Sequence, residues 1–254
     1  MNPPLLWHFP ISHFNEKVRW AFDFKRIPHL RRTLGPDYLV RAWWATGRAT
    51  LPILFLDGEA IGDSSRIIEA LERFKPDPPL YPHEESERRR ALELEEFFDE
   101  ELGHQVRAVI VGPLFAPLEP GAAIAALGTG MSPRAHRMMR LALPAFRSFY
   151  ERRHHITPET VEAGRAKVSA GLDRIAAELQ PSGYLVGKSF TVADLTAASL
   201  LCPIIMPPEF EYRATGTPPR PIQEYRDALA KHPAFQWAEE MFRRHRGKSS
   251  QIAG

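Results

Sequence analysis

Cysteine is almost absent from this sequence, in which Cys202 is the single one among 254 residues. An intramolecular disulfide and a Cys-x-x-Cys redox pair both need two cysteines, so neither exists within the chain. No apolar run approaches the about 20 residues that a membrane-spanning helix needs. The first residues also lack the basic stretch and apolar core of a secretion signal. These absences predict a cytoplasmic protein that does not bind a membrane.

The chain also lacks a large excess of positive or negative charge. The chain has 33 Lys and Arg against 31 Asp and Glu, a formal net charge of +2, which is too small to indicate a polyanionic partner. Basic runs at residues 88–90 and 243–246 stand beside acidic residues in helical patterns, as on solvated helix faces. We therefore expect no nucleic-acid partner. A hydrophobic content of 44% is ordinary for a globular protein that buries a core.

The first 75 residues alternate between strand and helix patterns. Strand patterns occupy residues 5–9, 29–34, 51–56 and 59–61, and helical patterns occupy residues 16–25 and 64–74. Asp57-Gly58 lies between two apolar runs and predicts a hairpin, because both turn positions favour positive φ. The segment that contains Pro36 and the pair Trp43-Trp44 is expected to be a loop. This order predicts a mixed four-stranded sheet with helices packed on it.

A linker and a helical region follow. Residues 75–82 contain four prolines and cannot continue a helix, so we predict two domains, residues 1–75 and residues 83–254. Helical patterns in the second domain occupy residues 84–111, 132–153, 160–179, 194–201, 222–229 and 232–244. The Pro- and Gly-rich stretches 112–130 and 203–221 are expected to be loops. The second domain is therefore predicted to be all-α.

Two features of the helical region have a structural interpretation. Thr191 stands three residues before Asp194, which is the spacing of a capping box at the start of a helix. Cys202 follows the apolar stretch of that helix, and we interpret it as a buried core thiol.

Ser12 is the residue most suggestive of chemistry. It lies between the first predicted strand and the first predicted helix, where backbone N–H groups are unpaired and the helix dipole is positive. Such a place suits an anion, a thiolate included. A helix cap is the alternative role, since Ser is common at that position.

Three segments together resemble the cytosolic glutathione transferases, over nearly the whole chain. Ser12 to Trp20 is similar to the first helix of the serine- and cysteine-type classes, zeta and omega especially, with Lys17 opening the basic-x-Arg pattern. Thr50 to Leu54 and Asp63 to Leu71 are similar to the strand with its proline and to the third helix of that family. The capping box is the third shared element. The resemblance implies an α/β thioredoxin-like, glutathione-binding N-terminal domain and an all-α C-terminal domain that carries the acceptor pocket.

The resemblance also implies roles for five residues. Ser12 is expected to donate its hydroxyl to the glutathione sulfur and to stabilise the thiolate. Pro52 is expected to be cis, with Leu51 offering its backbone N–H and C=O to the cysteinyl part of glutathione. Asp63 and Ser64 are expected to hold the γ-glutamyl carboxylate and ammonium at a helix start. Taken singly, Leu-Pro is also an ordinary strand start and Asp-Ser a common cap pair.

The sequence departs from the family at several places. The position of the catalytic Tyr of the tyrosine classes holds His8, which excludes that mechanism. Asp63 is shorter than the usual Glu or Gln, which predicts a looser ammonium contact. Arg41, Arg48 and Trp44 lie in the region where a partner for the glycyl carboxylate is expected, but they match no family pattern.

The leading prediction is a glutathione S-transferase, a homodimer that uses glutathione as co-substrate and no metal. Its acceptor would be a small hydrophobic electrophile, as in detoxification. The alternative is a non-catalytic protein of the same fold that binds a hydrophobic ligand or a protein partner. A donor thiol other than glutathione is a further alternative.

Overall fold

The N-terminal third of the chain forms a four-stranded mixed sheet in the computed structural model, which describes residues 3–35, 37–116, 120–129, 132–213 and 217–253. Its strands are β1 (Leu5–His8), β2 (Leu30–Thr33), β3 (Ile53–Leu56) and β4 (Glu59–Gly62). They lie in the order β2-β1-β3-β4, with β1 parallel to β2 and antiparallel to β3, and with β3 antiparallel to β4. The predicted sheet is confirmed.

Three helices accompany the sheet: α1 (His13–Phe24), α2 (Tyr38–Thr46) and α3 (Ser64–Phe74). Helix α3 has the predicted bounds because its ends are marked in the sequence. The Asp63 side chain caps its first turn, and Ile67 and Leu71 bury one face. Helix α2 corrects the expected loop around Trp43-Trp44. It ends at Thr46 and is followed by Gly47, whose φ of 71° suits the glycine that commonly terminates a helix.

The rest of the chain is helical, as predicted. Its helices are α4 (Glu85–Phe97), α5 (His104–Leu114), α6 (Pro120–Leu127), α7 (Pro133–Arg153), α8 (Pro158–Glu178), α9 (Val192–Ile205), α10 (Arg220–Leu229) and α11 (Pro233–His245). The single helix predicted over residues 84–111 is interrupted by a π-helical segment, Phe98–Gly103, between α4 and α5. Helix α6 and the end of α9 correct two expected loops.

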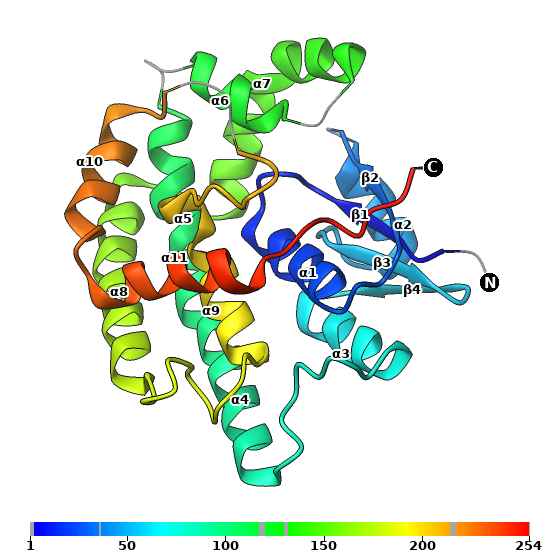
Figure 1. The fold of residues 1–254 in the computed structure, drawn as a ribbon. Coiled ribbons are helices and arrows are strands. Elements are labelled where there is room, and N and C mark those ends of the chain that lie inside the picture. The colour runs from blue at the N-terminus through cyan, green and yellow to red at the C-terminus, as the bar shows by residue number, and fades with distance from the viewer. Residues whose placement is uncertain (1–2, 36, 117–119, 130–131, 214–216, 254) are drawn as a thin grey trace.

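The sheet part and the helical part share one hydrophobic core. Helix α1 packs between them, against α3 on one side and α9 on the other, and buries Val18, Trp20 and Phe22. Figure 1 shows the sheet on one side of α1 and the long helices α4, α5, α8 and α9 on the other. This arrangement places the first turn of α1 between the two parts of the molecule.

The C-terminal tail returns to the sheet. After α11 it crosses to the edge strand β2, where the Ile252 N–H donates to the His29 carbonyl at 2.9 Å (Figure 1). Arg246 at the start of the tail is buried and forms ion pairs with Glu16 and Asp23 of α1. The tail therefore ties the last helix to the first one.

None of the described helices combines the length and the apolar character that a membrane-spanning segment needs.

Candidate functional site

Ser12 occupies the N-cap position of α1, with φ −76° and ψ 127°. Its carbonyl accepts the first helical bond from the Glu16 N–H at 2.9 Å, and its N–H donates to the Phe9 carbonyl at 3.2 Å. The hydroxyl makes no capping bond, and within the described parts of the chain it has no hydrogen-bond partner. Ser12 thus takes the cap position but leaves its hydroxyl uncommitted at the positive end of the helix.

Arg19 fixes the turn that carries Ser12. Its guanidinium donates to the carbonyls of Pro10 at 2.8 Å and Phe9 at 3.4 Å, and it pairs with Glu16 at 2.9 Å. His8 lies 3.0 Å from the same guanidinium. Burial, and then the charge of Arg19, lower the pKa of His8 well below its usual value. His8 is therefore a neutral, buried partner of Arg19.

Leu51 and Pro52 lie just before β3. The Leu51–Pro52 peptide bond is cis, as predicted. The backbone N–H and C=O of Leu51 have no hydrogen-bond partner in the described ranges. A peptide-like ligand that lay beside Leu51 would therefore find a free donor and a free acceptor, as at the edge of a sheet.

Asp63 and Ser64 stand at the start of α3. The Oδ1 of Asp63 accepts the N–H groups of Ser65 at 3.1 Å and Arg66 at 3.3 Å. The φ of Asp63 is 78°, a conformation that non-glycine residues rarely adopt and that clusters at ligand sites. Ser64 is buried beside it. One carboxylate oxygen of Asp63 therefore caps the helix, while the other makes no bond to the described residues.

A buried ion cluster lies beneath the start of α3. The Lys17 ammonium is fully buried, 2.6 Å from Asp99 and 2.9 Å from Glu95. The Ser65 hydroxyl joins it, accepting from Lys17 and donating to Asp99, each at 2.9 Å. Burial lowers the pKa of Lys17, but Glu95 and Asp99 outweigh this effect and the net pKa lies above the usual 10.5. The cluster joins α1, α3, α4 and the π-helical segment.

A cleft of about 810 Å³ opens above this cluster and is lined by four of the predicted residues, namely Leu51, Pro52, Asp63 and Ser64. Its charges come from different elements. The carboxylates belong to α3 and its N-cap, to α4 and to the π-helical segment: Asp63, Glu69, Glu95, Glu96, Asp99 and Glu100. The guanidinium groups belong to the segment before β3, to α5 and to α7: Arg48, Arg107 and Arg153. The cleft therefore suits an elongated ligand that carries charges of both signs.

Ser12 lines two smaller cavities next to the cleft. The first, of about 90 Å³, also includes Leu51 and Thr50, which are part of the cleft. The second, of about 70 Å³, is mostly apolar and includes Ile110 and Leu114 of α5. The Ser12 side chain thus lies between the charged cleft and an apolar space.

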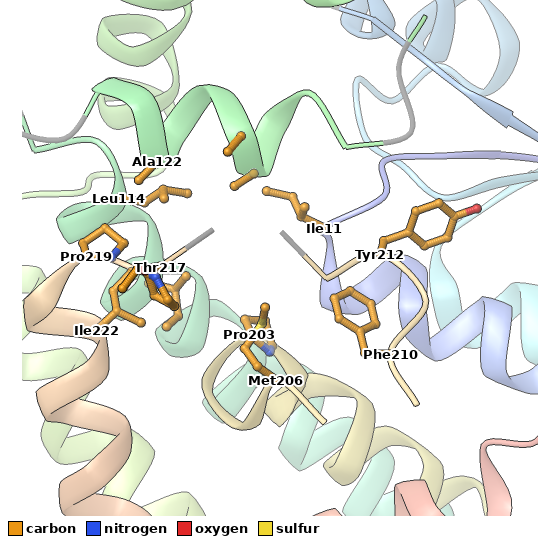
Figure 2. A pocket seen from close by; sticks show the side chains of 14 residues that line it. Ile11, Leu114, Ala122, Pro203, Met206, Phe210, Tyr212, Thr217, Pro219 and Ile222 are labelled. Carbon is orange, nitrogen blue, oxygen red and sulfur yellow. The ribbon is translucent and has the colours of Figure 1, made fainter. Parts of the chain in front are cut away.

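A third cavity, of about 100 Å³, continues the apolar space. It shares Ile11, Ile110, Leu114 and Pro203 with the second Ser12 cavity. Figure 2 shows side chains from the Ser12 turn, from α5, α6 and α9 and from the segment after α9 converging on it. Each described side chain that lines it is uncharged.

Four residues that line the cleft or the Ser12 cavities were not predicted from the sequence. They are Arg107 of α5, Tyr150 and Arg153 of α7, and His154 just after α7. Burial raises the pKa of Tyr150 and lowers that of His154 to about 3, so both are neutral near pH 7. The helices that carry these residues are far apart in the chain, and the linear pattern contains no signal for their meeting.

The three residues considered for the glycyl carboxylate have different surroundings. Arg41 pairs with Asp37 on the surface, and Trp44 is 77% exposed. Arg48 lines the cleft. In the described ranges, no group of three or more His, Cys, Asp or Glu side chains is placed to hold a metal ion.

The sequence matches two family descriptions. Residues 6–79 match the N-terminal domain of glutathione S-transferases, and residues 138–233 match their C-terminal domain. The chain belongs to the glutathione S-transferase family. This confirms the predicted family and its two-part fold.

Individual relatives are distant. FtsZ-localized protein A of Caulobacter vibrioides is 23% identical over 201 residues, which is 77% of this chain and 75% of that protein. The beta-etherase LigF of Sphingobium superposes with a TM-score of 0.61 at 19% identity, covering 94% of this chain and 99% of its own. A glutathione S-transferase from Methylobacterium radiotolerans, solved with glutathione sulfonate, gives a TM-score of 0.55 at 22% identity, covering 100% and 99%. At such identities these structures share the fold alone.

Two further predictions for this glutathione S-transferase family member are confirmed by the structure. The capping box is present, with the Thr191 N–H donating to the Asp194 carboxylate at 2.8 Å. Cys202 is fully buried, and burial raises the pKa of its thiol well above the usual value. All three residues are buried in the helical part.

Proposed function

We propose that this protein is a glutathione S-transferase in which the Ser12 hydroxyl donates a hydrogen bond to the glutathione sulfur. The observation that carries the proposal is the position of that hydroxyl. It is uncommitted, stands at a helix start, and lies where the charged cleft meets the apolar cavities. A hydrogen bond and a helix dipole stabilise a thiolate and lower the pKa of the thiol.

The cleft is suited to glutathione along its whole length. Leu51 offers a free backbone N–H and C=O for the cysteinyl residue. Asp63 and Ser64 hold the γ-glutamyl carboxylate and ammonium at the start of α3. For the glycyl carboxylate we propose Arg48 and Arg153, because both line the cleft and neither has an ion-pair partner among the described residues. Arg153 also donates to the Ala49 carbonyl at 3.2 Å, close to Thr50 and Leu51.

The acceptor is proposed to be a small uncharged electrophile. The apolar cavity of Figure 2 contains no charged side chain in its described lining and adjoins the Ser12 cavity through Ile11 and Pro203. Its volume of about 100 Å³ favours a small apolar group. The thiolate attacks an electrophilic carbon in this space. As the C–S bond forms, the bond between that carbon and its leaving group breaks, and the leaving group departs to solvent with the electron pair. We also propose a cytoplasmic homodimer with a detoxifying role, by analogy with the family.

A second candidate function is binding of a partner protein without catalysis. Three large apolar residues lie exposed on one face of helix α2. The exposed fractions of Val40, Trp43 and Trp44 are 61, 56 and 77%. The relative named FtsZ-localized protein A agrees with such a role. Replacing Ser12 by Ala separates the two functions, since it removes conjugation but leaves a protein-binding face intact.

Isothermal titration of the purified protein with glutathione tests the leading proposal. We expect binding in the micromolar to millimolar range, and markedly weaker binding by Asp63→Ala. Asp37→Ala is a matched control, because Asp37 also stands at a helix start but lies outside the lining of the cleft. Absence of heat with a folded protein would contradict the proposal and favour another thiol or the binding function.

A further inference from the structure

Arg107 lies where the charged cleft and the two cavities lined by Ser12 meet. It comes from α5 and lines the charged cleft and both of the cavities that contain Ser12. Its guanidinium lies 5.4 Å from the centre of the Phe14 ring and 3.1 Å, through Nη1, from Nδ1 of His154. The side chain is half-buried. These contacts, from α1 and from the residue just after α7, hold the guanidinium at the side of the cavities.

The charge of Arg107 is not neutralised by the protein. No Asp or Glu of the described ranges lies within 4.0 Å of it, whereas the fully buried cations Lys17 and Arg19 both have carboxylate partners. Asp99 and Glu100 line the same cleft but belong to the π-helical segment and make no ion pair with Arg107. A half-buried cation without a counter-ion attracts an anion into the adjoining space.

The His and Tyr side chains around Arg107 carry no negative charge that would cancel its positive charge. Burial, and then the charge of Arg107, lower the pKa of His13 and of His154 to about 3 each, and lower the pKa of His104. Burial raises the pKa of Tyr38 to about 12, and also raises that of Tyr150. All five side chains are neutral at pH 7. Among the charged side chains that line the cleft with Arg107, Arg153 is positive as well, and Asp99 and Glu100 form no ion pair with Arg107.

We propose that Arg107 is a second anion-stabilising residue, which contacts the sulfur of the bound thiol from the side of α5 while Ser12 contacts it from the start of α1. The inference rests on the proposed function. When the S–H bond ionises, the proton passes to solvent and the electron pair stays on sulfur, and the guanidinium compensates the new charge. The site should therefore prefer a ligand with an anionic sulfur group to one with a neutral sulfur.

Three probes test this preference by isothermal titration: glutathione, glutathione sulfonate and S-methylglutathione. We expect the wild type to bind the sulfonate more tightly than the S-methyl compound. In Arg107→Gln the affinity for the sulfonate should fall at least about tenfold, because a hydrogen bond to a charged group is lost. Affinity for S-methylglutathione should change little, and Arg107→Lys, which keeps a positive charge, should be intermediate.

Arg174→Gln is the matched control, because Arg174 also lies 5.4 Å from the centre of a phenylalanine ring, that of Phe97, but outside the site. It should bind all three probes like the wild type. An unchanged sulfonate preference in a folded Arg107→Gln protein, or an equal loss for all probes, overturns the role of Arg107 but not the proposed function. Failure of the wild type to bind any probe overturns both.

Discussion

Removing the Lys17 ammonium leaves two carboxylates unneutralised in the interior. Lys17 is fully buried, and it is 2.9 Å from Glu95 and 2.6 Å from Asp99, whose side chains are 5% and 16% exposed. The substitution Lys17→Met removes the ammonium and keeps most of the side-chain volume. Removing one partner of a buried ion pair costs about 3–5 kcal/mol. That is a large part of the about 5–15 kcal/mol that stabilises a typical domain.

The loss should depend on pH. Protonation of one carboxylate removes part of the uncompensated charge, so Lys17→Met should lose less stability at pH 5 than at pH 8. In the wild type the pKa of Lys17 is raised, so its contribution is complete below about pH 10.5 and is lost only as the pH rises through the higher pKa of the folded state.

Urea unfolding followed by circular dichroism measures both effects. The double variant Lys17→Met, Glu95→Gln should recover part of the loss, since it removes one of the two unpaired charges. A loss below about 1 kcal/mol, the range of exposed ion pairs, would show that Lys17 does not act as a buried counter-ion. A loss that grows towards low pH would contradict that role as well.

Two other predictions concern the helical part. Asp194→Ala leaves the buried N–H groups of Leu185 and Thr191 without an acceptor and should cost about 2–4 kcal/mol in urea unfolding. Because burial raises the pKa of Asp194 to about 6, its contribution is full below about pH 4 and falls as the pH rises through 6. The cost should therefore be larger at pH 5 than at pH 7, and an equal cost would contradict this. Cys202 should react with iodoacetamide only as fast as the protein unfolds, since its thiol is fully buried; rapid labelling of the native protein would contradict that burial.

Elements whose ends are marked locally were predictable from the sequence. Helix α3 begins after the cap Asp63 and repeats its apolar residues at helical spacing, and the hairpin between β3 and β4 turns at Asp57-Gly58. Helix α6 was missed because prolines and glycines surround it, although Pro120 at its first position suits a helix start. Helix α2 was missed because its tryptophans lie exposed rather than on a buried face.

Only part of the candidate site could be predicted from the sequence. The reason differs from the one that hid helices α2 and α6. Ser12, Leu51, Pro52, Asp63 and Ser64 all lie in the first 75 residues, where the order of short motifs carries the family resemblance. Their proposed roles remain predictions. The residues that face them from α5 and α7 are brought there by packing between distant helices, which a single sequence does not encode in any local pattern.

The proposed function depends on the stabilisation of the glutathione thiolate by Ser12. The most direct test is the pKa of the thiol of bound glutathione, measured from the ultraviolet absorbance of the thiolate as a function of pH, in the wild type and in Ser12→Ala. We expect the pKa of the bound thiol to lie about two units below that of free glutathione in the wild type, and to return towards the free value in the variant. An equally lowered pKa in both proteins would contradict this role of Ser12, and so would an unshifted pKa in the wild type.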